Sequence, residues 1–238
     1  MRSPPRGVRP GERFSAWRRA ARFVALWAAV GAAGLVPPAF APAAAAQSDP
    51  EATLRAIDAR YAPVRDLRGR FVQTSFIASI GREEVSRGEV VVERPGRIRW
   101  SYDAPDGRVI LLDGDSVRLY SPEDAQLQIA PLQPGTVSPT ALGFLMGETR
   151  LAEQFRPQAL EGRGVLDGLR LIPRDDSGFE SLTLWVDRET RELRESVLVD
   201  LFGNRTRLEL AELDHDAGTR PEDFEIDVPE GTEIIDLR

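Results

Sequence analysis

Hydrophobic and polar residues alternate in short runs between Gly88 and Gln128, and turn-forming residues separate the runs. The runs cover Val90–Glu93, Arg97–Tyr102, Arg108–Leu112 and Ser116–Tyr120. The separating turns contain Pro95-Gly96, Pro105-Asp106-Gly107 and Asp113-Gly114. Asp-Gly between apolar runs is a hairpin signal, because Gly adopts the positive φ that a tight turn requires. The segment is therefore predicted to form an antiparallel β-meander.

The run Arg97–Tyr102 places Ile98, Trp100 and Tyr102 at alternate positions, with polar residues between them. In a strand, alternate side chains point to the same face. This strand therefore has a wide apolar face, which is typical either of a core edge or of a cavity wall.

Further strands are predicted at both ends of the meander, and hairpin turns are expected at Asp187–Arg191 and Phe202-Gly203-Asn204. The other predicted strands cover Leu67–Phe76, Gln126–Pro131, Arg156–Glu161, Val165–Pro173, Ser181–Asp187, Leu193–Asp200, Arg205–Leu213 and Glu225–Val228.

Two helices are predicted. The first covers Pro50–Tyr61, with Asp49 as its N-cap and Leu54, Ile57 and Tyr61 on one side. The second covers Pro139–Gly147 and is apolar nearly all round, so it must be buried or face a cavity. A further short turn is expected at Leu151–Phe155. The pattern alone predicts a mainly β domain, a curled sheet or a sandwich, with helices covering part of its apolar face.

Several pieces of the chain, taken in order, resemble the outer-membrane lipoprotein carrier protein (LolA) family. They span most of the chain after about residue 50: Arg70-Phe71-Val72-Gln73-Thr74, Gly88-Glu89-Val90, Glu93-Arg94-Pro95-Gly96-Arg97-Ile98-Arg99-Trp100, Leu112-Asp113-Gly114, Leu119-Tyr120-Ser121-Pro122 and Asp223-Phe224-Glu225-Ile226-Asp227-Val228-Pro229. The resemblance implies an incomplete antiparallel β-barrel, with a short helical lid over an apolar cavity.

The N-terminal segment has the pattern of a secretory signal peptide. Basic residues occupy Arg2–Arg22, an apolar run follows over Phe23–Val36, and Ala44-Ala45-Ala46 precedes Gln47. The apolar run is shorter than the roughly 20 residues that span a bilayer. We therefore expect cleavage of residues 1–46, export to the periplasm and a single carrier domain over residues 47–238.

Composition narrows the expected partners. Removing residues 1–46 takes away seven Arg and one Glu, so the net charge falls from −7 to −13. An acidic protein is a poor ligand for nucleic acid. The chain has no Cys, so it has neither a disulfide nor the acylated Cys of an anchored lipoprotein. The expected protein is a soluble monomer in the periplasm.

The residues that enzymes and metal sites use most often are scarce. The chain has one His, His215, between Asp214 and Asp216, and a solvated loop is a simpler interpretation of this trio than a metal site. Gly162-Arg163-Gly164 lacks the spacing of a phosphate-binding loop. No catalytic residue, metal site or cofactor is predicted.

A cavity that shields acyl chains needs an apolar lining, and we expect it from both the sheet and the helices. The expected lining residues are Phe71, Ile98, Trp100, Leu111, Leu119 and Leu184 from the sheet, and Leu54, Ile57, Leu142, Leu145 and Met146 from the helices. Each of them could equally belong to an ordinary core. Trp185 and Tyr120 are expected on the opposite face from their neighbours.

Arg94 stands where the resemblance places the lid-contacting arginine of the carrier family. An Arg at the lip of an apolar cavity can donate hydrogen bonds to the free carbonyl groups at a helix end and so hold a lid shut. The alternative is a solvated turn arginine beside Arg97 and Arg99.

The resemblance implies a carrier that takes acylated lipoproteins from an inner-membrane lipoprotein-releasing transporter and passes them to an outer-membrane lipoprotein receptor. Three alternatives stay open. They are a periplasmic sensor on the same half-barrel fold, a carrier of another lipid or amphiphile, and a hydrolase, which the scarcity of His and Cys disfavours.

Overall fold

The computed structural model describes residues 49–114, 116–132, 144, 147, 149–175 and 178–238. Its main feature is one sheet of twelve strands in the order β12-β6-β5-β4-β3-β2-β1-β11-β10-β9-β8-β7. All neighbouring pairs are antiparallel except β12 and β6, which run parallel. The strands are β1 (Asp66–Ile77), β2 (Arg82–Glu93), β3 (Arg97–Tyr102), β4 (Val109–Asp113), β5 (Ser116–Ser121), β6 (Gln126–Pro131), β7 (Phe155–Arg163), β8 (Leu166–Pro173), β9 (Phe179–Asp187), β10 (Leu193–Asp200), β11 (Arg205–His215) and β12 (Glu233–Asp236).

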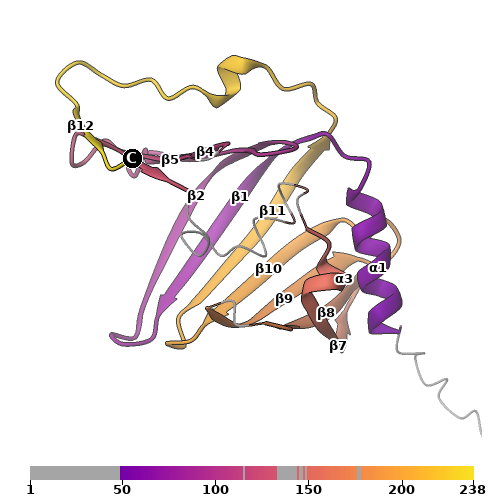
Figure 1. Ribbon diagram of the computed structural model, residues 1–238. Helices are drawn as coiled ribbons and strands as arrows, with labels where there is room; N and C mark the ends of the chain where they lie inside the picture. The colour runs from indigo at the N-terminus through magenta and orange to yellow at the C-terminus, as the bar shows by residue number, and fades with distance from the viewer. Residues whose placement is uncertain (1–48, 115, 133–143, 145–146, 148, 176–177) are drawn as a thin grey trace, which may run out of the picture. The chain divides into compact units, whose positions relative to one another are not determined.

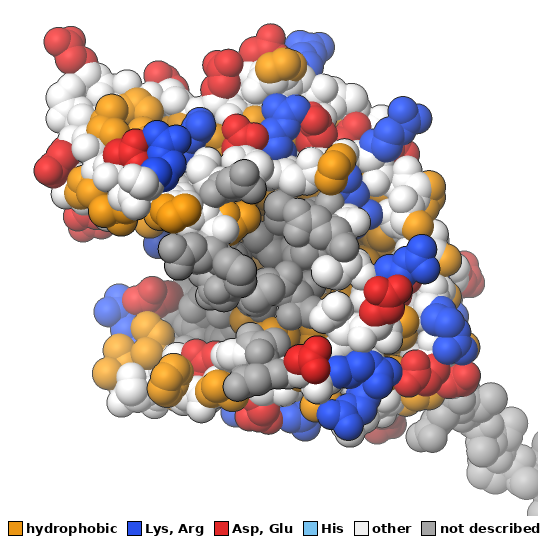
Figure 2. Space-filling model, in the orientation of Figure 1, with side chains coloured by type: hydrophobic (Ala, Val, Ile, Leu, Met, Phe, Trp, Pro, Cys, Tyr) orange, Lys and Arg blue, Asp and Glu red, His pale blue; other side chains and the backbone are white. Residues whose placement is uncertain are grey.

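The sheet is curled and does not close. Its long central strands run diagonally between the layer that contains β3 to β6 and the layer that contains β7 to β9 (Figure 1). Helix α1 (Pro50–Tyr61) and the short helix α3 (Leu151–Gln154) lie at one end of the curl. On the opposite side the surface is hollowed between two lips that carry apolar side chains (Figure 2). Mainly β structure in a curled, unclosed sheet confirms the predicted fold class.

Helix α1 has the predicted bounds, because its sequence carries a complete start signal. The Asp49 carboxylate accepts a hydrogen bond from the Glu51 amide at 3.0 Å, and Pro50 occupies the first turn. Leu54, Ile57 and Tyr61 are buried, as their helical spacing predicts. No helix in the described part of the chain is long and apolar enough to span a membrane.

The main apolar cluster lies on the inner face of the curl. Phe71 pairs with Gly88 on the neighbouring strand β2. The centre of its ring lies 5.1 Å from that of Trp100 and 5.3 Å from that of Tyr102. A Cβ at Gly88 would lie 2.0 Å from the Ser101 carbonyl oxygen and 2.6 Å from the Phe71 ring. The Phe71 ring and β3 can therefore lie this close to residue 88 only because it has no side chain.

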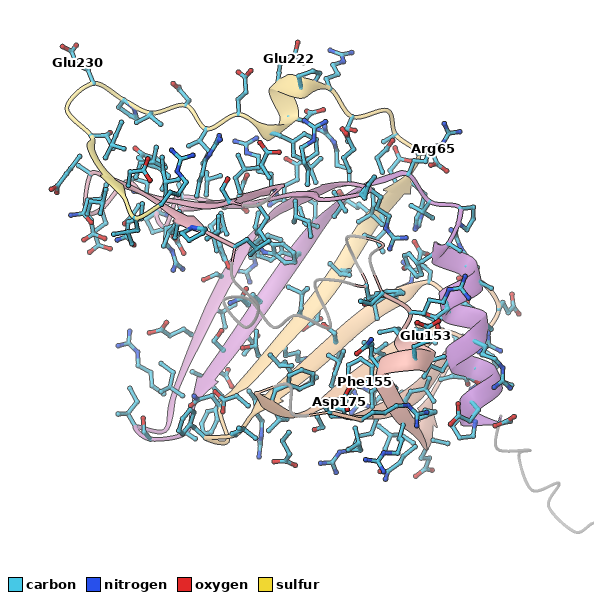
Figure 3. The ribbon with its side chains drawn as sticks, in the orientation of Figure 1. Arg65, Glu153, Phe155, Asp175, Glu222 and Glu230 are labelled. Atoms are coloured by element: carbon cyan, nitrogen blue, oxygen red, sulfur yellow. The ribbon has the colours of Figure 1, made fainter. Side chains whose placement is uncertain are left out.

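A second, smaller cluster lies on the outer face. After β11 the chain forms the 3₁₀ turn η1 (Pro221–Phe224) and then runs outside the sheet to β12, with Glu222 and Glu230 pointing away from it (Figure 3). Phe224 packs with Val91 and Leu111, and Ile226 lies against the three. The C-terminal segment therefore covers the outer face of β2 and β4.

Two sequence predictions about strands need correction. Glu225–Val228 is not a strand: its alternating apolar residues reflect an extended chain packed on one side, and the edge strand is β12, eight residues later. Strand β2 begins at Arg82, well before the predicted Val90. The hydrophobic pattern does not predict its first half, because those residues are polar and mostly exposed and form no apolar face. The predicted helix over Pro139–Gly147 lies almost entirely outside the described residues.

Gly88→Ala should lower the free energy of unfolding by about 1–3 kcal/mol, because the added methyl group forces the Phe71 ring or the β3 backbone to move. Urea denaturation of both forms would measure the loss. Ser86→Ala, on the same face of the same strand, is the matched control and should change stability by less than about 0.5 kcal/mol. Equal losses from the two substitutions would contradict the packing argument.

Candidate functional site

The inner face of the curl encloses a small apolar pocket. Its volume is about 40 Å³, and Ser196 is the one polar residue among the described residues that line it. The others are Leu67, Val90, Val92, Trp100, Phe144, Leu151, Leu182, Leu184, Leu193, Leu208 and Leu210. Pockets that hold drug-sized ligands span roughly 300–1,000 Å³. The pocket as it stands therefore has the surface chemistry of a lipid site but lacks the room for an acyl chain.

The structure places most of the expected lining residues on or against this inner face. Trp100 and Leu184 line the pocket itself. Leu54, Ile57, Phe71 and Ile98 belong to the surrounding apolar cluster and are at most 2% exposed.

Leu119 is half-buried and lies on the inner face as well. It pairs with Ile110, which pairs with Trp100, and directly paired residues share a face. Leu142, Leu145 and Met146 lie outside the described residues.

Leu111 does not belong to this lining. It is fully buried, but on the outer face, where it packs against Val91 and Phe224 beneath the C-terminal segment. The prediction that it lines the cavity is wrong. Leu111 and Leu112 are consecutive apolar residues, and the alternation rule cannot decide which of the two faces inward when a second cluster covers the outer face. Leu112 is the inward residue.

Arg94 joins two separate segments at the edge of the pocket. One guanidinium nitrogen donates to the carbonyl oxygen of Tyr61, at the end of α1, over 2.6 Å. The other terminal nitrogen donates to the carbonyl oxygen of Phe144 over 2.7 Å. We call Arg94 with these two carbonyl groups the Arg94 latch.

Two aromatic rings surround the latch, and its guanidinium group is partly buried. The Arg94 guanidinium lies 6.0 Å from the centre of the Tyr61 ring and 5.8 Å from that of Phe144, and the two rings meet edge to face at 5.3 Å. Burial lowers the pKa of Arg94, and the Tyr61 hydroxyl opposes that shift. Gly147, at φ +76°, lets the arginine pass close by, since a Cβ there would lie 3.0 Å from Arg94 Cδ.

The α1 side of the latch is fixed by hydrogen bonds of its own. On the α1 side, the Asp58 carboxylate accepts hydrogen bonds from the backbone amides of Leu151 and Ala152 at 2.9 and 3.0 Å. The Tyr61 hydroxyl accepts another from the Leu193 amide at 3.0 Å. Helix α1 is thus fixed both to α3 and to the sheet. Phe144, the other acceptor of the latch, lines the pocket and takes no part in those bonds.

A surface cleft of about 390 Å³ lies over the latch, lined by residues that include Arg65, Arg94 and Thr149. Water in this cleft can replace the hydrogen bonds of the latch when it opens, which lowers the free energy that opening requires.

Sequence reasoning overlooked two residues of this site. Tyr61 carries the predicted helix spacing, but its roles as a carbonyl acceptor and as the hydroxyl anchor of α1 depend on distant partners. Phe144 falls within the predicted second helix but is not among the expected lining residues. A helix that is apolar all round does not indicate which of its side chains faces the pocket.

His215 packs beside the end of α1. Its ring centre lies 5.9 Å from that of Tyr61, and Arg60 Nη2 lies 3.5 Å from its Nδ1. Burial lowers the pKa of His215, and the positive charge of Arg60 lowers it further, while Glu192, Asp214 and Asp216 oppose these effects. Among the described residues, no group of three His, Cys, Asp or Glu side chains is placed to hold a metal ion.

The fold and its interior define a class of protein: a half-barrel with an apolar inner face around a small apolar pocket. Comparison with known proteins gives the family. The family model of the outer membrane lipoprotein carrier protein LolA matches residues 62–227, and the chain belongs to that family.

Individual relatives extend the match over most of the chain. An outer-membrane lipoprotein carrier protein of Bordetella pertussis is 30% identical over 222 residues, which cover 92% of this chain and 98% of that protein. One of Nitrosomonas europaea is 32% identical over 149 residues, 62% of this chain and 71% of the relative. Both relatives are named as carriers. A solved structure, a LolA superfamily protein of Nitrosomonas europaea, is 14% identical, with a TM-score of 0.40 and coverage of 73% of this chain and 97% of that one.

Arg94→Leu should release Phe144 without unfolding α1. Hydrogen bonds to a charged donor contribute about 1.5–3 kcal/mol each, so the local opening free energy at this edge should fall by an amount of that order. Hydrogen exchange of the Gly147 amide, which donates to the Phe144 carbonyl at 3.0 Å, would report it.

Arg97→Leu is the matched control, since Arg97 pairs with Glu93 and stacks 4.6 Å from the Phe224 ring on the outer face. Unchanged exchange at Gly147 in the Arg94 variant would contradict the latch.

Stability should decrease as the pH falls through the range just below His215's unfolded pKa of about 6.5. The folded state holds that pKa lower, so the unfolded state binds the proton first, and the stabilisation present above the unfolded pKa is lost on acidification. His215→Gln should abolish this step, because the chain has no other His. Urea midpoints measured from neutral to mildly acidic pH would test it. A step of equal size in the variant would assign it to other groups.

Proposed function

We propose that this protein is a periplasmic carrier that accepts acylated lipoproteins from an inner-membrane lipoprotein-releasing transporter and delivers them to an outer-membrane lipoprotein receptor. The proposal rests on one observation: a single residue, Phe144, belongs both to the Arg94 latch and to the wall of the pocket. Phe144 receives a hydrogen bond from Arg94 and also lines the apolar pocket. Opening the latch therefore exposes the surface that acyl chains need.

The physical problem for such cargo is the aqueous gap between two membranes. Each buried CH₂ group contributes about 0.8 kcal/mol, so an acyl chain of about 16 carbons loses on the order of 10 kcal/mol on leaving a bilayer for water. A carrier must replace most of that loss with its own apolar surface. The inner face of the curl offers such a surface, since eleven of the twelve described residues that line its pocket are apolar.

Release requires that the apolar surface become covered again by the protein itself. The closed pocket of about 40 Å³ and the two hydrogen bonds of Arg94 support this cycle. Cargo binding breaks the latch and separates Phe144 from the pocket, and re-formation of the latch favours departure of the cargo. No covalent bond is made or broken in this cycle, so the proposal needs no catalytic residue.

The remaining parts of the proposal are the processing, the location and the state of the chain. Residues 1–46 act as a signal peptide, and residues 47–238 act as one monomeric carrier domain in the periplasm. Membership of a carrier family supports the location and the cargo class, and the signal pattern at Arg2–Ala46 supports export. A sensor of mislocalised lipid, or a carrier of another amphiphile, would use the same pocket.

Wild-type protein added to spheroplasts should release newly made lipoprotein as a soluble one-to-one complex. Arg94→Leu should take up cargo but transfer at least about tenfold less of it to outer membranes, because the latch that contributes a few kcal/mol to closure is missing. Immunoprecipitation of pulse-labelled lipoprotein measures both steps.

Arg97→Leu should behave as the wild type in both steps. Release of nothing by the wild type would overturn the lipoprotein assignment, and lipids extracted from the purified protein would then identify another amphiphile.

A further inference from the structure

Three large apolar side chains gather in the solvent at one end of the curled sheet. Ile80 lies in the turn between β1 and β2, and Leu201 and Phe202 lie in the turn between β10 and β11. They are 65%, 64% and 86% exposed, respectively. We call these three residues the apolar tip. Figure 2 shows apolar side chains collected at the lower left, where these hairpins end in Figure 1.

The two turns of the apolar tip are joined and ordered. The Ala78 amide donates to the Asn204 side-chain oxygen at 2.9 Å, which links one hairpin to the other. Within the second turn, the Asp200 carboxylate accepts hydrogen bonds from the Phe202 and Asn204 amides at 2.8 and 2.9 Å. The backbone therefore holds Leu201 and Phe202 outward in a defined geometry.

The exposed side chains of the apolar tip contribute little to the packing of the described chain. A single exposed apolar residue is ordinary, and Val165, alone in the turn between β7 and β8, is an example at 68% exposure. Three such residues on two hydrogen-bonded turns place exposed apolar side chains at one end of the sheet, which is typical of a contact site.

The size and surroundings of the apolar tip favour a lipid surface over a protein partner. A stable protein interface covers about 800 Å² on each partner, far more than three side chains on a convex tip can supply. Insertion into the boundary between headgroups and acyl chains requires only a few apolar side chains, with aromatic residues favoured.

Arg82 and Arg205 begin the strands that leave the two turns, where their guanidinium groups can meet phosphates. Arg82 already forms an ion pair with Glu84 at 3.1 Å. Its charge is therefore balanced within the protein, and binding does not depend on an anionic lipid.

We infer that the apolar tip inserts into the interface of a phospholipid bilayer. This contact goes beyond the carrier function proposed above, because it requires neither cargo nor latch. Arg94 follows the far end of β2, and a strand of twelve residues spans roughly 36 Å, so a change at the tip leaves the latch intact. The contact is weak and reversible, since even a whole myristoyl chain gives only marginal binding.

The test uses protein recovered from cells that express the full chain, with its N-terminus read by mass spectrometry, mixed with phosphatidylcholine vesicles at millimolar lipid. The wild type should float with the vesicles, and Leu201→Ser with Phe202→Ser should lower the partition coefficient at least about tenfold. Val165→Ser, an equally exposed residue in another turn, should change it by less than about twofold.

A second measurement reads insertion directly. Because the chain has no Cys, Phe202→Cys and Val165→Cys each accept a single environment-sensitive fluorophore. The label at residue 202 should brighten and shift to the blue with vesicles, and the label at residue 165 should not.

Three results would overturn the inference: no flotation of the wild type, equal losses in the tip and control variants, or equal responses of the two labels. If the wild type dimerises without lipid and the double variant stays monomeric, the apolar tip contacts a second copy and the bilayer proposal is wrong. No lipoprotein is added in these assays, and the mass spectrum of the purified protein shows whether any is bound, so their outcome is independent of the release experiment.

Discussion

In the proposed carrier, the Arg94 latch must be strong enough to keep the apolar interior closed and weak enough to open. A charged donor on two backbone carbonyl groups meets both demands, since each such bond contributes about 1.5–3 kcal/mol and water in the adjoining cleft can replace it. If Phe144 were held only by apolar packing, the cargo would compete directly with it for the same surface. In the proposed cycle, the hydrogen bond from Arg94 separates the strength of closure from the affinity for acyl chains.

This separation depends on the anchoring of helix α1, one of the two segments that Arg94 joins. Three hydrogen bonds, from the Leu151, Ala152 and Leu193 amides, fix α1 to α3 and to β10. The buried side chains Leu54 and Ile57 add apolar packing to that anchor. Tyr61 therefore presents its carbonyl group from a fixed position. Phe144 is both the second acceptor and part of the pocket wall, so movement at one residue changes the hydrogen bonding and the apolar exposure together.

Sequence reasoning predicted the parts of this design that have local causes. Asp49 and Pro50 set the start of α1, and the Asp-Gly and Pro-Gly turns set the meander, because each signal acts within a few residues. The sequence did not reveal contacts between distant segments. Leu111 was assigned to the wrong face, since only the return of Phe224 over β4 creates a second apolar cluster. The long polar half of β2 was missed for the converse reason: it pairs with β1 through its backbone and needs no apolar face.

The same sheet accounts for both functional ends of the protein. The absence of a side chain at Gly88 lets the Phe71 ring pack closely on the inner face, while the long strands β1 and β2 continue to the apolar tip. A closed barrel of the same strands would have a fixed lumen, and a flat sheet would leave its apolar face in water. An open curl needs a separate cover, and that cover can be released. The unclosed edge is therefore the structural condition that makes a releasable cover, and with it a carrier, physically possible.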